Sequence, residues 1–301
     1  MRTTEFPWYQ APFFEFNVPQ AAVIPFIDWD GNLVVSFATA VGKTVIAECC
    51  FGYHLSQKEG SVAYISPYRS LSAEKHEQWS DNVQLSRYGL VLSTGDHRAT
   101  AEDFTHARLA NVTLESFDSK TRSPAYKDWI KRLDCVVFDE AHVIGVKGRG
   151  GALECAMMRL TTINPRARIV LLSATLGNAM SLARWLKALN GKPTKSFVSE
   201  WRPNVVEPHI HVVEEYEKED KAIELVRERT VGEKMIVFVH SKAVGARLVK
   251  AFRKMGIRSG FHNASVSKPE RAKMEQAFND KASGFDVLVS TSTLGAGVNI
   301  G

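Results

Sequence analysis

Residues 33–44 read LVVSFATAVGKT, and this stretch decides what kind of fold the chain can adopt. Its apolar first half predicts a strand, and the residues from Lys43 to about position 52 are typical of a helix. Where a strand turns into a helix N-terminus, backbone N–H groups can hold phosphate oxygens. Gly42 would let the backbone approach, Lys43 would bridge the β- and γ-phosphates, and the Thr44 hydroxyl would contact Mg²⁺. The loop residues expected at the nucleotide are Thr39, Ala40, Val41, Gly42, Lys43 and Thr44.

A pair of carboxylates supports this interpretation. Phe37 stands where the strict phosphate-loop pattern has its first glycine, so the loop alone leaves a chance Gly-Lys-Thr open. Asp139 and Glu140, however, follow directly after the apolar run that ends at Phe138, where a parallel sheet binds ligands. Asp139 can hold Mg²⁺ through its water shell, and Glu140 can polarise the water that attacks the γ-phosphate. The alternative is an acidic pair that caps a helix, which the upstream loop disfavours.

Short β-rich runs alternate with helical stretches along the chain, which predicts an α/β fold with a mainly parallel sheet. We expect two such units, residues 1–203 and 204–301, because prolines interrupt any regular element near residues 191–220. The second unit is short for a complete one. The expected strands are residues 33–37, 62–65, 90–92, 134–138, 169–172, 236–239 and 286–290.

Composition excludes several classes of protein. The 301 residues are 45% hydrophobic and 24% charged, which is ordinary for a globular protein and excludes a disordered or collagen-like chain. No run approaches the roughly 20 apolar residues of a membrane span, and the N-terminus has no signal-peptide core. We therefore expect a cytoplasmic, intracellular protein without membrane contact. The four cysteines form no CxxC pair and are expected to be buried, reduced thiols.

Other short segments occur along the chain in an order known from one protein family. In the first unit they are Ser66-Pro67-Tyr68-Arg69-Ser70-Leu71, Ser93-Thr94-Gly95-Asp96, Thr113-Leu114-Glu115, Arg149-Gly150, Ser173-Ala174-Thr175 and Trp201-Arg202-Pro203. In the second unit they are Phe238-Val239-His240-Ser241, Phe261-His262-Asn263-Ala264 and the motif V segment Thr291–Asn299. With the loop and Asp139-Glu140-Ala141-His142, they resemble the motifs of superfamily 2 DEAH-box-type helicases, in the Ski-like branch that includes the archaeal Hjm repair helicases.

The resemblance implies two RecA-like units of the P-loop NTPase type in tandem, with ATP and Mg²⁺ as cofactors. Gln20 stands where the family reads adenine, and Gly297 would lie near the nucleotide. His142, Ser173 and Thr175 would couple the nucleotide state to motion. The residues that the resemblance places at nucleic acid are Arg69, Gly95, Thr113 and Glu115 in the first unit, and Lys242, Thr291 and Asn299 in the second.

The implied function is an ATP-dependent helicase or translocase that moves along single-stranded nucleic acid, 3′ to 5′ as in the family. The Arg-Gly form after Asp139-Glu140 favours DNA slightly over RNA, and a monomer is expected. The chain departs from the family pattern because it stops at Gly301, after motif V and before the arginines of motif VI. The second unit is therefore expected to be incomplete. An ATP- and nucleic-acid-binding fragment without hydrolysis stays open as an alternative.

Overall fold

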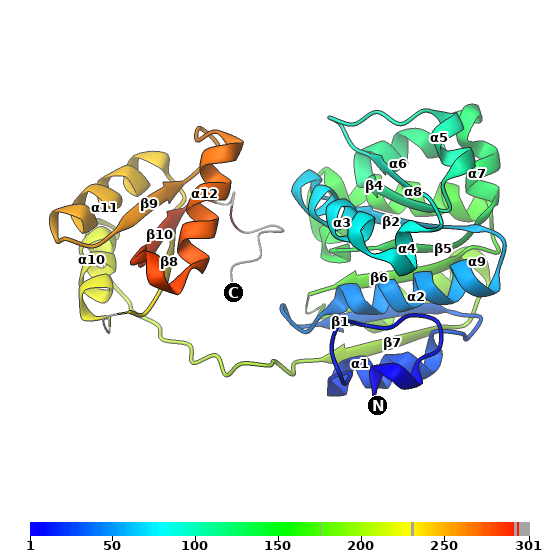
Figure 1. Ribbon diagram of the computed structural model, residues 1–301, viewed down its shortest axis with the longest axis horizontal. Helices are drawn as coiled ribbons and strands as arrows, with labels where there is room; N and C mark the ends of the chain where they lie inside the picture. The colour runs from blue at the N-terminus through cyan, green and yellow to red at the C-terminus, as the bar shows by residue number, and fades with distance from the viewer. Residues whose placement is uncertain (175, 230–231, 292–293, 295–301) are drawn as a thin grey trace. The chain divides into compact units, whose positions relative to one another are not determined.

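The computed structural model describes residues 1–174, 176–229, 232–291 and 294. The chain divides into two compact units, Met1–Val205 and Val206–Gly301, and each is described by itself. Over the described residues of the first unit, seven parallel strands form one sheet in the order β3-β4-β2-β5-β6-β1-β7 (Figure 1). The strands are β1 Asn32–Phe37, β2 Ser61–Ser66, β3 Leu90–Ser93, β4 Leu109–Thr113, β5 Leu133–Phe138, β6 Arg168–Ser173 and β7 Thr194–Ser199.

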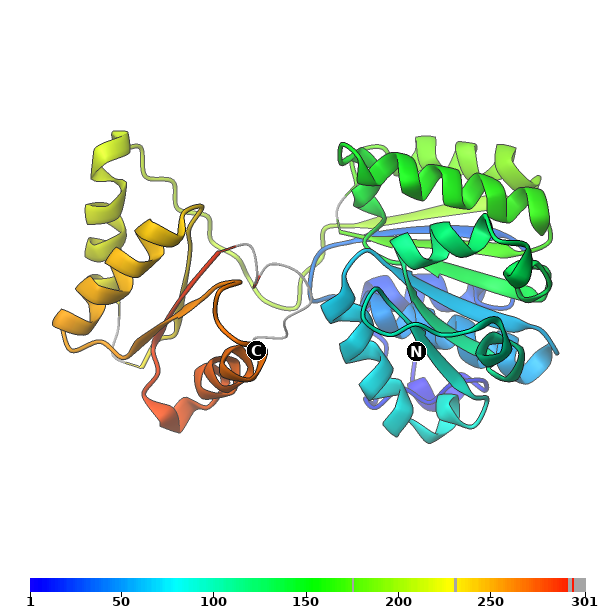
Figure 2. The ribbon, with the colours of Figure 1, turned by 90° about the horizontal axis from the view of Figure 1, so that it is seen from above.

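Helices cover both faces of this sheet (Figure 2). One face carries the N-terminal segment with α1 Val18–Val23, α2 Lys43–Gln57, α3 Arg69–Asp81 and α4 Val83–Ser86. The other carries α5 Ala101–His106, α6 Leu114–Thr121, α7 Lys127–Lys131, α8 Arg149–Ile163 and α9 Ala179–Asn190. Because side chains alternate along a strand, Leu33 and Val35 of β1 enter the first core and Val34 the second. Burial on both faces explains the continuous apolar runs in the sequence.

In the second unit, three parallel strands form a sheet in the order β8-β10-β9 over the described residues. Its elements are α10 Lys218–Glu228, β8 Met235–Phe238, α11 Lys242–Lys254, β9 Ser259–His262, α12 Lys268–Asn279 and β10 Val287–Ser290. Val226, Phe252 and Val287 belong to its core. Within the described residues, no helix is long and apolar enough to cross a bilayer. The predicted α/β class, built on parallel sheets, is confirmed.

The sequence pattern did not predict three strands, which are β4, β7 and β9. β4 has the polar residue Asn111 at its centre; the side chain is buried and donates a 2.7 Å hydrogen bond from Nδ2 to the Ser72 carbonyl oxygen. β7 lies at the sheet edge and is only partly buried, so it keeps polar residues, and the predicted absence of regular structure is wrong over Thr194–Ser199. β9 is four residues long. The prediction of buried thiols is also wrong for Cys155, which is exposed on α8.

Candidate nucleotide and nucleic-acid sites

Residues at the start of α1 stabilise the loop between β1 and α2. Asn17 caps α1, and its Nδ2 donates to the Val41 carbonyl oxygen at 2.9 Å. Gln20 is buried, and its Nε2 donates to the carbonyl oxygens of Val41 and Gly42 at 3.0 and 3.1 Å. The amide that the family resemblance places at adenine therefore also fixes the conformation of the loop. Its two N–H groups are engaged there, and its Oε1 accepts from the Asn17 N–H at 3.1 Å.

Two residues of the loop have left-handed backbone conformations. Gly42 has φ +80°, and a Cβ at this position would lie 2.6 Å from Gln20 Nε2. Ala40 has φ +67°, a region that costs a residue with a Cβ about 1–2 kcal/mol. Thr39 and Ala40 are exposed at the tip, and Thr44 is half-buried in the first turn of α2. The Lys43 ammonium group folds back to the carbonyl oxygens of Phe37 and Ala38, at 3.3 and 3.4 Å.

Asp139 lies at the carboxyl end of β5, which is the second strand over from β1. Its Oδ2 accepts a hydrogen bond from the hydroxyl of the fully buried Tyr64, and its Oδ1 accepts from the Glu140 N–H at 2.8 Å. Burial and then the charge of Glu140 raise the pKa of Asp139. A carboxylate and the Thr44 hydroxyl are oxygen donors of the kind that Mg²⁺ prefers, and one bond to each carboxylate oxygen leaves lone pairs for a metal or its water. The residues present therefore fit Mg²⁺.

Glu140 adopts a left-handed backbone conformation, with φ +51°. Its Oε2 lies 3.2 Å from His142 Nδ1. Burial acts to raise the pKa of Glu140, but the hydrogen bond to His142 and the charge of Lys43 bring it below its ordinary value. The same hydrogen bond raises the pKa of His142. The pair is therefore arranged to keep Glu140 ionised, as a base that accepts a proton from water must be.

Ser173, at the end of β6, connects the Glu140–His142 pair to β1, the strand that precedes the loop. Its Oγ accepts from the His142 N–H at 3.1 Å and lies 3.4 Å from His142 Nδ1. Ser173 is paired in register with Ser36 of β1, whose Oγ accepts from the Leu176 N–H at 2.7 Å. The structure thus brings together two of the predicted coupling residues, His142 and Ser173. The third, Thr175, lies outside the described residues.

A cavity of about 420 Å³ lies at the carboxyl ends of β3 and β4. The four first-unit residues that the family resemblance places at nucleic acid all line it: Arg69, Gly95, Thr113 and Glu115. Arg69 and Asp96 form an exposed ion pair at 2.9 Å. Arg149 donates to a Glu115 carboxylate oxygen and to the Pro67 carbonyl oxygen, each at 2.8 Å.

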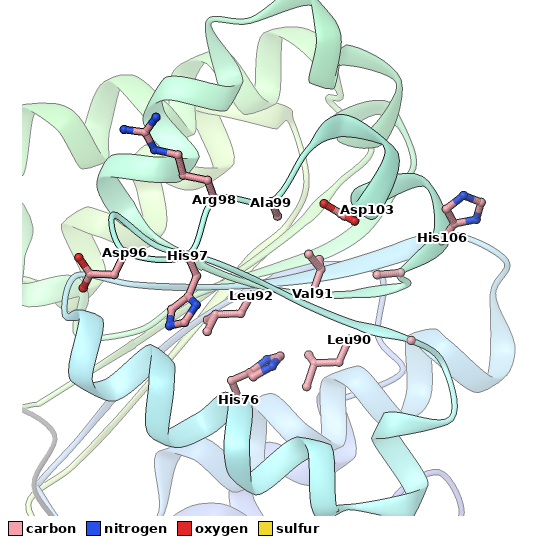
Figure 3. Close-up of a pocket in the computed structure, with 12 residues that line it drawn as sticks. His76, Leu90, Val91, Leu92, Asp96, His97, Arg98, Ala99, Asp103 and His106 are labelled. Atoms are coloured by element: carbon pink, nitrogen blue, oxygen red, sulfur yellow. The ribbon is translucent and has the colours of Figure 1, made fainter. Parts of the chain in front are cut away.

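A second cavity, of about 620 Å³, lies along β3 and shares Arg98 and Ala99 with the first (Figure 3). In Figure 3, His97 points toward His76, while Arg98 points the other way. Its wall holds several histidines and acids. Even so, no group of three or more His, Cys, Asp or Glu in the described part of the chain could hold a metal ion.

In the second unit, Lys242 begins α11 and its Nζ donates to Ser265 Oγ at 2.6 Å. Thr291 follows β10, and its N–H donates to the His262 carbonyl oxygen at 3.2 Å. The remaining predicted residues, Gly297 and Asn299, lie outside the described residues.

Sequence reasoning missed three side chains of the first unit. Tyr64 stands inside an apolar strand run and reads as core, and Ser36 stands inside another. Lys120 follows the Thr113-Leu114-Glu115 segment without any motif of its own. A polar group in the middle of a fully buried strand is the one signal that would have singled out Tyr64 and Ser36.

Comparison with known proteins agrees with this geometry. Residues 17–182 match the family model described as DEAD/DEAH box helicase, and residues 217–301 match the one described as helicase conserved C-terminal domain. The ATP-dependent DNA helicase Hel308 of Thermococcus kodakarensis is 30% identical over 93% of this chain and 28% of its own length. Hel308 of Pyrococcus abyssi is 30% identical over 95% of this chain and 44% of its own. The chain thus spans less than half the length of these relatives.

Among solved structures, the DUF1998 helicase MrfA bound to DNA has a TM-score of 0.75 and 17% identity over 96% of this chain and 44% of its own. This likeness confirms the predicted tandem RecA-like fold. The Hel308 relatives confirm the predicted likeness to the Ski-like branch. The family model matches more than half of the chain, so the chain belongs to the DEAD/DEAH box helicase family.

Proposed function

We propose that this chain hydrolyses ATP to move along single-stranded DNA, as the ATP-binding and C-terminal RecA-like domains (residues 1–203 and 204–301) of a DNA helicase. One observation carries the proposal. The loop with Lys43, the Asp139–Glu140 pair and the cavity lined by Arg69 and Thr113 all belong to the carboxyl-end side of one parallel sheet. DNA rather than RNA follows from the relatives, which are DNA helicases by name. An intracellular monomer is part of the same proposal.

The chemistry would depend on Glu140. Thr44 and Asp139 would hold Mg²⁺, which would draw negative charge from the β- and γ-phosphates, and Lys43 would add its own positive charge. Glu140 would accept a proton from the water that attacks the γ-phosphate. His142 holds the Glu140 carboxylate in place, and Ser173 links both to β6 and, through the paired strand, to the loop. A change in these contacts would couple the nucleotide state to the residues that contact DNA.

The experiment is steady-state ATP hydrolysis with and without single-stranded DNA or RNA, on the wild-type chain and on Lys43→Ala. We expect hydrolysis that DNA stimulates more than RNA. Lys43→Ala should lose productive ATP binding and keep DNA binding, because the phosphate path is separate. Equal affinity of both proteins for a fluorescent ATP analogue would reject the loop assignment.

A second candidate function is binding of ATP and DNA without turnover. Residues 204–301 contain no Gly-Arg-x-Gly-Arg segment that could place an arginine on the γ-phosphate. Such an arginine contributes about 10³–10⁵ in rate. DNA-independent, near-background hydrolysis with intact ATP and DNA binding would select this alternative. Unwinding of duplexes with 3′ rather than 5′ tails would test the direction.

A further inference from the structure

Lys120 is a lysine buried in the protein. It lies on α6, it is 8% exposed, and it lines the 420 Å³ cavity at the ends of β3 and β4. Its Nζ donates to Ser93 Oγ at 2.9 Å and to Ser116 Oγ at 3.0 Å. The same nitrogen lies 5.2 Å from the ring centroid of Phe104 and 4.8 Å from that of Tyr126. The ammonium group is therefore held in one place by two hydroxyls and two aromatic faces.

This buried cation has no acidic partner among the residues that the structure describes. Within the described ranges, no carboxylate oxygen lies within 4.0 Å of Lys120 Nζ. Both acidic residues of α6 have other partners. Asp118 forms ion pairs with Arg159 and Arg122, and Glu115 forms one with Arg149. Burying a charge without a counter-charge is unfavourable, and here burial lowers the pKa of Lys120. An anion that enters the cavity would relieve that cost.

The rest of the cavity wall suits an anion. Arg98 adds a guanidinium group, Arg69 adds one that is ion-paired with Asp96, and Thr94 and Ser119 add hydroxyls. Glu115 is the one carboxylate among the described residues of the wall, and it is already in an ion pair with Arg149. Figure 3 shows Arg98 directed away from the neighbouring cavity along β3. Positive charge therefore prevails in this cavity.

We propose that Lys120 binds one backbone phosphate of the DNA strand in this cavity. The inference rests on the proposed function, because it assumes that single-stranded DNA follows the wall that Arg69 and Thr113 share. Lysine has three N–H donors, and two of them are directed to Ser93 and Ser116. The third is left for a phosphate oxygen. The alternative is that Lys120 has a purely structural role and fixes the conformation of the loop after β3.

The test compares Lys120→Met, which keeps an unbranched side chain but removes the ammonium group, with Lys120→Arg, which keeps the charge. Lys127→Met is the matched control, because Lys127 is exposed on α7 and lines none of the cavities described above. Binding of a labelled oligothymidylate is measured by anisotropy over a range of salt concentrations. Thermal unfolding of each variant checks that the fold persists.

Lys120→Met should weaken binding at low salt about tenfold, as expected for loss of one charge-assisted hydrogen bond. The slope of log K against log salt concentration should fall by about 0.7, the value for one phosphate contact on a single strand. Lys120→Arg and Lys127→Met should keep the wild-type slope. A wild-type slope in a folded Lys120→Met protein, even with reduced affinity, would overturn the inference and leave the proposed function standing. Failure of the wild type to bind the oligonucleotide would overturn both.

A second measurement uses the wild-type chain alone, in case Lys120→Met does not fold. Lysines are acylated with a water-soluble ester, with and without oligothymidylate, and the extent at each lysine is read by peptide mass spectrometry. We expect DNA to protect Lys120 and to leave Lys127 unchanged. Equal modification of Lys120 in both samples would contradict the proposal.

Discussion

Removing the Tyr64 hydroxyl tests how the buried carboxylate of the proposed Mg²⁺ site is stabilised. Tyr64→Phe keeps the ring against Phe51 and Trp79, at centroid distances of 6.5 and 5.0 Å, and removes only the bond to Asp139. A hydrogen bond to a charged group contributes about 1.5–3 kcal/mol, and the lost donor leaves Asp139 Oδ2 buried without one. We therefore expect the free energy of unfolding of the first unit to fall by about 1.5–3 kcal/mol.

Urea unfolding followed by tryptophan fluorescence measures this change in the first unit alone. All tryptophans lie before residue 206, at positions 8, 29, 79, 129, 185 and 201. With a denaturant slope of about 2–3 kcal/mol/M, the midpoint should move down by about 0.5–1.5 M urea. Tyr126→Phe is the matched control, because its hydroxyl donates to the neutral Ala99 carbonyl oxygen at 3.1 Å. Its loss should cost about 0.5–1.5 kcal/mol.

The charge of Asp139 should be visible in two further readouts. In the Asp139→Asn background, Tyr64→Phe removes only a neutral hydrogen bond, so the double-mutant cycle should give a coupling of about 1 kcal/mol. The effect of Tyr64→Phe should also shrink as pH falls through the raised pKa of Asp139, since protonation removes the charge that the hydroxyl stabilises. Additive effects, or a loss no larger than that of Tyr126→Phe, would refute the reasoning.

Three further substitutions in the first unit carry the remaining predictions. Glu140→Gln should slow hydrolysis by about 10²–10⁴-fold while ATP still binds, and unchanged turnover would reject Glu140 as the base. In the same variant, NMR titration should show a lower pKa of His142. Because the His142 pKa is raised in the folded state, the stability that wild type has over Glu140→Gln should shrink as pH rises above about 6.5. Ala40→Gly should relieve about 1–2 kcal/mol of backbone strain and should cost about 0.4–1 kcal/mol through the greater entropy of the unfolded chain. We therefore expect a higher urea midpoint of unfolding, and a lower midpoint would contradict this reasoning. Gly150→Ala would place a Cβ 2.1 Å from the Ile144 carbonyl oxygen, so thermal unfolding should occur at clearly lower temperature, and an unchanged melting temperature would show that α8 shifts freely.

Much of the fold could be predicted because fully buried parallel strands leave apolar runs that periodicity detects. β5 and β6 are examples: Asp139 directly follows β5, and β6 ends at Ser173. β7 could not be found in this way, since an edge strand with partly buried faces carries lysine and serine without cost. The same limit applies to the site. Lys43 and Glu140 stand in motifs. Lys120 is informative only through its burial and through having no acidic partner in the described part of the chain, which a sequence does not display.

The position of β1 in the sheet also determines how long this strand stays without one of its neighbours during translation. β1 pairs with β6 on one side and β7 on the other, and Phe37 is opposite Ser199. At about 5–20 residues per second, a ribosome needs on the order of ten seconds or more after Phe37 before it reaches Ser199. Until then the nascent β1 strand has no neighbour on its β7 side and offers an open edge to other chains or to a chaperone. The loop that would bind ATP is translated near the start, but the strand that leads into it is among the last to be enclosed.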